Sequence, residues 1–247
     1  MTPIFSHTHE GDRVSTVLPE ARQAIRTPRA AAIAGIVFSV LLTISLLIIR
    51  LSIIAKSRDL SAWLSDSFHQ KIVAFALNLV PFAGIAFLWF IGVVRDHLGD
   101  REDRLFSTVF LGSGLLFVAM LFATAAVGGV LTANFADAVP GSAGNTVWEF
   151  ELQVTSSFLT IYAMRMAGVF MITTATLALR TGFLPRWFVF FGYICALILL
   201  LTINFAPWIE FLLPLWVFMV SLHILRINWG QQLQTQPTPM PTTKANV

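Results

Sequence analysis

The sequence has little charge and almost no cysteine. Of its 247 residues, 12% are charged, and the single cysteine, Cys195, lies inside an apolar run. A soluble domain carries about 25% charged residues, so the low charge argues against an ordinary soluble fold. One cysteine excludes an internal disulfide and a metal site built from several thiolates.

The motifs of common enzyme and binding classes are also absent. The sequence contains no nucleotide-binding glycine loop, no metalloprotease helix motif, and no serine or cysteine nucleophile with a base beside it. Its net charge of +3 comes from positive residues scattered between apolar runs, not clustered with aromatics, so nucleic acid is not expected as a partner. We therefore expect no catalytic residue, no metal and no cofactor, and the sequence favours a protein without enzymatic activity.

Long hydrophobic runs, in contrast, dominate the chain. Hydrophobic residues make up 56% of it and gather in six segments. A helix needs roughly 20 mostly apolar residues to cross about 30 Å of hydrocarbon, and continuous runs favour helices over a membrane barrel. The sequence predicts an all-α polytopic membrane protein with six transmembrane helices. The predicted spans cover about residues 30–49, 72–94, 105–131, 157–179, 187–206 and 208–225.

Polar tails flank this predicted transmembrane domain of residues 30–225. Residues 1–29 form a polar N-terminal tail, and residues 226–247 form a polar, proline-spaced tail that we expect to be disordered. A cleaved signal peptide has a small-residue cleavage site after its apolar core. Here Arg50 follows the core, so the first span is expected to stay in the protein.

The distribution of lysine and arginine predicts the orientation. If both termini are cytoplasmic, eleven of the sixteen Lys and Arg residues lie on the cytoplasmic side and four on the outer side, with one inside a span. Positive charge in short loops favours the cytoplasm, so we expect a multi-pass protein of the cell membrane with both termini inside.

The residue inside a span is Arg165, eight residues past the predicted start of the fourth span. Tyr162 lies one turn before it, and Gly168, Thr173 and Thr176 continue a mildly polar stripe along the helix. A charge at this depth is costly unless it is paired, reaches the headgroups or lines a wet cavity. We therefore expect the stripe to face the bundle and not the lipid.

Carboxylates that could pair with Arg165 are scarce. Glu210, at the start of the sixth span, is the first candidate, and Glu151, just before the fourth span, is the second. Two roles for Arg165 stay open at this point. It forms a structural ion pair with Glu210, or it binds a ligand together with Tyr162 and nearby acidic residues.

Two further polar residues inside spans are candidates for a site. Asn78 precedes Pro81, which frees a backbone carbonyl, so Asn78 either supports a structural kink or contributes to a ligand site. His223 lies near the inner end of the sixth span and is either a proton relay or a hydrogen-bonded interfacial residue. It is the only histidine inside a span, so haem held by two histidines of this chain is not expected.

Small residues predict where the helices touch, because close approach holds membrane helices together. Gly192 and Ala196 mark such a face on the fifth span. Ala119, Ala123 and Ala126 mark one on the third, which has the most small residues and is therefore expected to be the most central helix.

The stretch RTGFLPRWFVFFGY, residues 180–193, and the acidic–basic turn before the third span resemble uncharacterised bacterial multi-pass integral membrane proteins known only as domains of unknown function. The resemblance implies a bacterial inner-membrane location and no particular activity. Two functions stay open. One is a non-enzymatic protein that assembles with itself or with a membrane complex in the bilayer, and the other is a small transporter or permease whose outward vestibule centres on Arg165.

Overall fold

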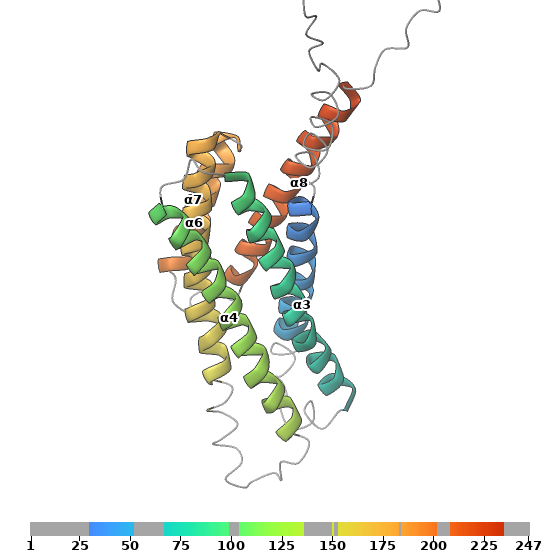
Figure 1. Cartoon of the computed structure of the whole chain (residues 1–247). Helices are drawn as coiled ribbons and strands as arrows, with labels where there is room; N and C mark the ends of the chain where they lie inside the picture. The colour runs from blue at the N-terminus through green and yellow to red at the C-terminus, as the bar shows by residue number, and fades with distance from the viewer. Residues whose placement is uncertain are drawn as a thin grey trace, which may run out of the picture.

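The chain is described by a computed structural model, which covers residues 30–51, 67–98, 104–135, 150, 153–182, 184–201 and 208–234. These residues are helical apart from short turns and contain no strand. Figure 1 shows their helices side by side in a bundle, with the first helix beginning and the last helix ending at the same end. The N-terminal tail and residues 235–247 lie outside the described residues.

Five helices are long and apolar enough to cross a membrane, and a sixth apolar helix is shorter. The five candidate spans are Ala30–Leu51, Gln70–Arg95, Leu105–Val130, Gln153–Thr181 and Ile209–Ile227. The helices labelled in Figure 1 are α3 (Ser67–Leu98), α4 (Arg104–Phe135), α6 (Met164–Thr181), α7 (Arg186–Leu201) and α8 (Leu212–Gln234). A polytopic helical membrane protein is therefore confirmed at the level of its helices.

The helix ends differ from the predicted bounds in two places. α7 has 16 residues, fewer than the roughly 20 needed to cross the hydrocarbon in full. Residues 202–206, which the sequence assigned to the same span, lie outside the described residues. α8 continues to Gln234, past the predicted end of the sixth span at Leu225.

The turn between α6 and α7 has a clear local cause. Gly182 ends α6 in the left-handed region with a φ of 71°, which glycine adopts without strain, and its N–H donates to the carbonyl of Ala178 at 2.9 Å. Pro185 directly precedes α7, where its missing N–H removes no helical hydrogen bond. The two helices therefore form a tight hairpin and pack along each other.

Phenylalanines from four helices form the centre of the bundle. The ring of Phe87 on α3 lies 4.5 Å from that of Phe38 on the first helix and 4.9 Å from that of Phe170 on α6. Phe170 in turn stacks on Phe110 of α4 at 5.1 Å. All four side chains are fully buried. Offset and tilted ring pairs of this kind add specific contacts where burial alone does not drive helices together.

Small residues of α6 and α7 allow the closest helix contacts. A Cβ added at Gly168 of α6 would lie 3.0 Å from the carbonyl oxygen of Ala196 on α7. One added at Gly192 would lie 2.8 Å from the indole nitrogen of Trp216 on α8. The expected contact face on Gly192 and Ala196 is thus confirmed, and it holds α7 between α6 and α8.

The expectation that the third span is the most central helix is wrong. Only 33% of its apolar window is buried, against 56% for Gln153–Thr181. Ala119 and Ala126 of the predicted contact face are exposed, whereas Gly114 and Phe117 are buried. Ala119 and Ala126 therefore lie on the outer surface of α4 and Ala123 is partly exposed, whereas the face that packs inward includes a glycine and large aromatic side chains.

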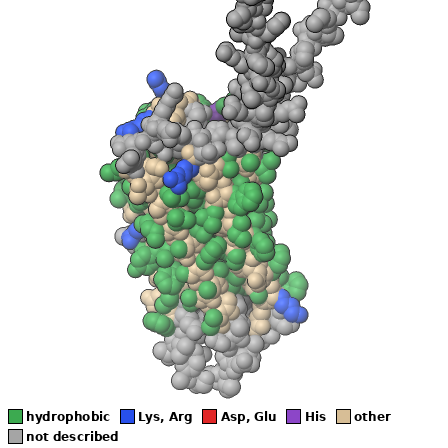
Figure 2. Space-filling model, in the orientation of Figure 1, with side chains coloured by type: hydrophobic (Ala, Val, Ile, Leu, Met, Phe, Trp, Pro, Cys, Tyr) green, Lys and Arg blue, Asp and Glu red, His purple; other side chains and the backbone are tan. Residues whose placement is uncertain are grey.

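The described outer surface of the bundle is apolar. Figure 2 shows a broad hydrophobic belt with Lys and Arg side chains near its two ends and few within it. Large exposed side chains on α3 include Phe82, Ile85 and Trp89, each at least half exposed. Such a belt is unstable in water and suits contact with lipid chains.

Candidate functional site

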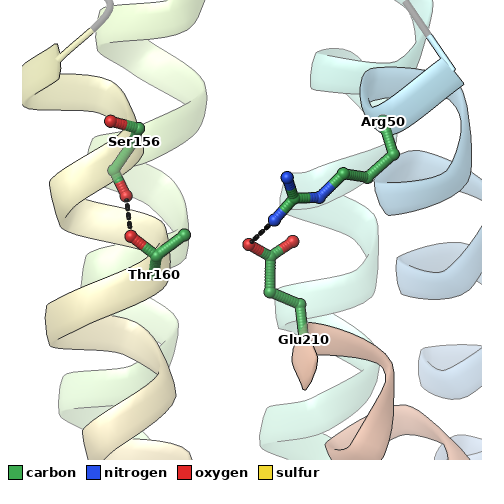
Figure 3. A network of polar contacts seen from close by, with 4 residues as sticks. All are labelled: Arg50, Ser156, Thr160 and Glu210. Atoms are coloured by element: carbon green, nitrogen blue, oxygen red, sulfur yellow. Dashed lines mark hydrogen bonds and ion pairs between the residues drawn. The ribbon is translucent and has the colours of Figure 1, made fainter. Parts of the chain in front are cut away.

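A buried ion pair joins the first helix to the last. The Nη2 atom of Arg50 donates to the Oε1 atom of Glu210 at 2.5 Å, and the side chains are 19% and 5% exposed. Arg50 comes from the C-terminal end of the first helix, and Glu210 from the short 3-10 turn η3 (Ile209–Phe211) that leads into α8. Figure 3 shows the two side chains reaching toward each other across the space between their helices.

The predicted ion pair between Arg165 and Glu210 is therefore wrong. Glu210 is engaged by Arg50, and among the described residues Arg165 has neither an ion pair nor a side-chain hydrogen bond. By its position in the sequence, either arginine could lie at the membrane depth of Glu210. In the structure, Arg50 at the end of the first helix is the residue that reaches it. Glu151, the second candidate, lies outside the described residues.

Arg165 sits on the less buried side of its helix. Arg165, Val169 and Ile172 are partly exposed, whereas Ala167 and Phe170 are fully buried. Tyr162, one turn earlier, is 54% exposed. The expected inward orientation of the polar stripe thus holds for Gly168 and Thr173, which are buried, and it is wrong for Tyr162, which is exposed. Arg165 and Thr176 are both partly exposed.

An irregular turn precedes Arg165. Residues Phe158–Ala163 form the π-helical turn η2, and at its end the N–H of Met164 donates to the carbonyls of Leu159 and Ile161. A π-helical turn accommodates extra residues and thereby rotates the side chains before it relative to those after it. Such turns are frequent at functional sites, and this one lies directly beside the only arginine in the middle of a span.

Hydroxyl groups line the same part of the helix. Ser157 donates to the carbonyl of Gln153 at 2.8 Å, and Thr160 donates to that of Ser156 at 2.6 Å, as Figure 3 shows for the second pair. These bonds satisfy the hydroxyl protons within the helix, which permits serine and threonine in an apolar layer. Their oxygen atoms stay on an exposed part of the helix. We call Ser156, Ser157, Thr160, Tyr162 and Arg165 the polar face.

The described residues of α7 pack beside α6, the second part of the helix Gln153–Thr181. Gly168 contacts Ala196 and Leu200 of α7, and α7 ends one residue later at Leu201. The helix Gln153–Thr181 continues beyond that end for more than ten residues, and Figure 1 shows it extending past α7. The polar face therefore lies on the part of this helix beyond the last described residue of α7, and residues 202–207, which follow it, lie outside the described residues.

The other predicted site residues lie apart from the polar face. Asn78 is exposed on α3 and donates its amide N–H to the carbonyl of Ala74 at 2.8 Å. It therefore bonds within its own helix, to Ala74 and not to the carbonyl at Leu77 that Pro81 frees. His223 is half-buried on α8, with its ring 5.1 Å from that of Phe188 on α7. Of the predicted set, Arg165 and Tyr162 are neighbours only in that they lie three positions apart on one helix.

Sequence reasoning missed two polar contacts between helices. Arg50 directly follows the first apolar run, and this position at the end of a predicted helix was the only signal available for its contact with Glu210. Tyr193 of α7 approaches Thr176 of α6 at 2.8 Å. Because Thr176 gives its proton to the carbonyl of Ile172, the hydroxyl of Tyr193 must donate to Thr176.

Neither a metal cluster nor a match to a known protein assigns a function. Within the part of the chain that the structure describes, no three His, Cys, Asp or Glu side chains gather in a way that could hold a metal ion. No protein-family model, no curated protein and no solved structure matches this chain. The function has to be inferred from the chemistry of the polar face and of the helices around it.

Proposed function

We propose that the protein is a non-enzymatic integral membrane protein that acts by assembly, with itself or with a membrane complex, through the polar face around Arg165. The observation that carries the proposal is an arginine on the less buried side of a membrane-spanning helix, without a partner among the described residues. Charged residues inside spans pair with other groups or face protein and water, because lipid does not solvate them.

The depth of Arg165 makes a partner necessary. It is twelve residues from the start of the 29-residue helix Gln153–Thr181. If that helix is centred on about 30 Å of hydrocarbon, Arg165 lies about 12 Å inside it at 1.5 Å per residue. An arginine that extends toward the headgroups escapes part of the cost of this position. A carboxylate or several carbonyl oxygens from a neighbouring chain would remove much more of it.

The rest of the polar face suits a helix contact. Tyr162 offers a large exposed ring with a hydroxyl, and Ser156, Ser157 and Thr160 are small residues whose oxygen atoms can accept hydrogen bonds. Small and hydroxylated residues allow a neighbouring helix to approach closely in lipid. The preferred partner is therefore a membrane helix with an acidic residue at matching depth.

A transporter with an outward vestibule at Arg165 is the competing function. It requires a polar route through the bundle, but the inward side of α6 presents Ala167, Phe170, Met171 and Ala175, all fully buried. The described residues on the buried side of α6 also include Thr173 and Thr174, but their hydroxyls donate to carbonyls of their own helix, at Val169 and Phe170, and form no polar route. This favours assembly over transport.

We further propose that the protein lies in the cell membrane with both termini in the cytoplasm. The charge distribution supports this orientation, and an even number of passes agrees with the ends of the first and last helices lying together in Figure 1. Reporter fusions at the two termini test the orientation, and activity of the reporters on opposite sides of the membrane would contradict it.

The assembly is tested by measuring the mass of the particle extracted from native membranes in mild detergent. We expect the unchanged protein to migrate as a complex and the Arg165→Leu variant to lose it, because the partner's acidic residue would then be left uncompensated. Arg165→Lys keeps the charge and should retain part of the complex. Arg180→Leu is the matched control, since Arg180 lies on the same helix and stacks on Phe106 of its own chain at 4.3 Å.

Two results would decide against assembly. One is a particle of a single chain for the unchanged protein. The other is a complex that Arg165→Leu leaves intact. A rise in melting temperature with small anions that disappears in Arg165→Leu would instead favour the transporter.

A further inference from the structure

A groove of about 670 Å³ runs between α3 and α4. Lys71 and Gln70 lie at one end of it, and its walls include Pro81, Phe122 and Gly129. Its volume lies in the range of sites that hold small organic ligands. Neither the ion pair nor the polar face uses any of these residues.

The two ends of the groove differ in chemistry. Lys71 is exposed and lies one residue after the start of the span Gln70–Arg95, so its ammonium group belongs at the depth of the headgroups. Pro81 follows ten residues later, about 15 Å along the helix and therefore within the hydrocarbon. Most side chains that line this part of the groove are small and apolar. Ala125 and Ala126 of α4 form the wall across from Pro81 of α3.

Glycines of α3 and α4 shape the floor of the groove. A Cβ added at Gly129 would meet no atom within 4 Å, so the space above this residue is open. A Cβ added at the neighbouring Gly128 would lie 3.2 Å from the side chain of Leu77, so α3 and α4 pack directly against each other beside the groove. The ring of Phe122 packs against Gly84 and closes the deeper end.

The one polar side chain in the apolar part is partly satisfied. Asn78 donates its amide N–H to Ala74 at 2.8 Å, within its own helix. The groove therefore combines a cation at the membrane surface with a largely apolar channel below it. An anionic phospholipid has the same arrangement, with a phosphate above an acyl chain.

We propose that this groove binds an anionic phospholipid of the surrounding bilayer, with the phosphate at Lys71 and one acyl chain along Gly129 and Ala126. Charge complementarity selects this occupant over an apolar helix of a second copy, which would leave the ammonium of Lys71 without a counter-charge. Basic residues beside grooves between transmembrane helices bind anionic headgroups elsewhere by the same physics. The proposal does not depend on the assembly proposed above.

The test measures how much lipid the purified full-length protein retains. The protein is incubated in detergent with phosphatidylglycerol or with phosphatidylcholine of the same acyl chains, and bound lipid is counted by native mass spectrometry. We expect about fivefold more phosphatidylglycerol than phosphatidylcholine, the preference given by one basic residue near an anionic headgroup. Melting temperature in the same samples should rise more with phosphatidylglycerol.

Four variants separate the contributions of charge and space. Lys71→Gln should abolish the headgroup preference, and Gly129→Leu should reduce retention of both lipids by filling the floor. Arg95→Gln removes an exposed charge from the other end of the same span, and Gly92→Leu adds the same side chain where a Cβ also meets nothing within 4 Å, but outside the groove. Both control variants should retain lipid as the unchanged protein does.

Three results would overturn the proposal. The first is equal retention of the two lipids with no effect of Lys71→Gln. The second is a rise in melting temperature with glycerol phosphate alone that equals the rise with phosphatidylglycerol. The third is efficient disulfide cross-linking of Ala126→Cys between two copies in lipid, which would place a second chain in the groove. Cys195 is buried and does not provide this cross-link.

Discussion

Arg50 and Arg165 are both arginines of apolar helices, but they differ in whether the described residues provide an ionic partner. Arg50 meets Glu210 inside the bundle, and both side chains are mostly buried. Arg165 lies closer to the middle of its helix, on a less buried side, and has no ionic partner among the described residues. The ion pair accounts for the first arginine within the chain, whereas our proposal gives the second a partner outside it.

The depth of a charged residue in the membrane therefore does not by itself assign its role. A pair closed within one chain holds helices that are far apart in the sequence, here separated by 160 positions. A partly exposed charge without such a pair among the described residues is, in our proposal, the point at which a partner binds.

Glu210→Leu should have the largest effect, a loss of about 3 kcal/mol in the free energy of unfolding, because it leaves Arg50 partly buried without its counter-charge. The double variant Arg50→Leu/Glu210→Leu should recover much of that loss, since it removes both charges together. Reversible denaturation in detergent measures both values. Equal stability of the single variant and the unchanged protein would show that the pair contributes nothing.

Gly192→Val should lower stability by about 2 kcal/mol, since the new side chain would collide with the buried ring of Trp216. The control is Gly112→Val on α4, where a Cβ meets no atom within 4 Å. The two melting curves separate a closed contact inside the bundle from an open position. Similar losses for both variants would mean that the packing of α7 on α8 is not tight.

Tyr193→Phe should reduce stability by about 0.6 kcal/mol, the average contribution of a hydrogen bond between membrane helices. It removes the bond that Tyr193 donates to Thr176 and leaves the ring in place. Thr176→Val combined with Tyr193→Phe should add little to the single change, because both remove the same bond. Strictly additive losses would argue against the bond.

Arg165→Leu should change the stability of the isolated single chain least, by no more than about 0.5 kcal/mol, since Arg165 has no ion pair or side-chain hydrogen bond with another described residue and the change removes a costly charge. Arg50→Leu measured beside it should be clearly destabilised. If Arg165→Leu instead lost as much stability as Arg50→Leu, Arg165 would have an internal role and the contrast would disappear.

The sequence predicted the helices well because length and hydropathy are properties of a continuous segment. Each of the six apolar runs contains a described helix, and Gly182 and Pro185 mark the turn between α6 and α7. Gly192 and Ala196 also indicated the correct side of α7, since only small residues allow the observed contact with Gly168 and Trp216.

The side that each helix turns inward was harder to predict. In a soluble protein, polar residues mark the outer side of a helix, but lipid is as apolar as the protein interior. Ala119 and Ala126 therefore looked like a contact face and are exposed, whereas Phe117 is buried. The π-helical turn η2 added a rotation that no regular spacing of residues indicates, and Tyr162 and Arg165 emerged on the less buried side.

By itself, the sequence determined that this chain folds as apolar helices and that an arginine would have to be accommodated within one of them. Both follow from the free energy of transferring each segment into lipid, which depends on the segment's own residues. Only the tertiary structure decided that Glu210 pairs with Arg50, because helices of equal polarity can be neighbours in many arrangements. That choice depends on shape and close packing between distant segments, which composition and spacing do not encode directly.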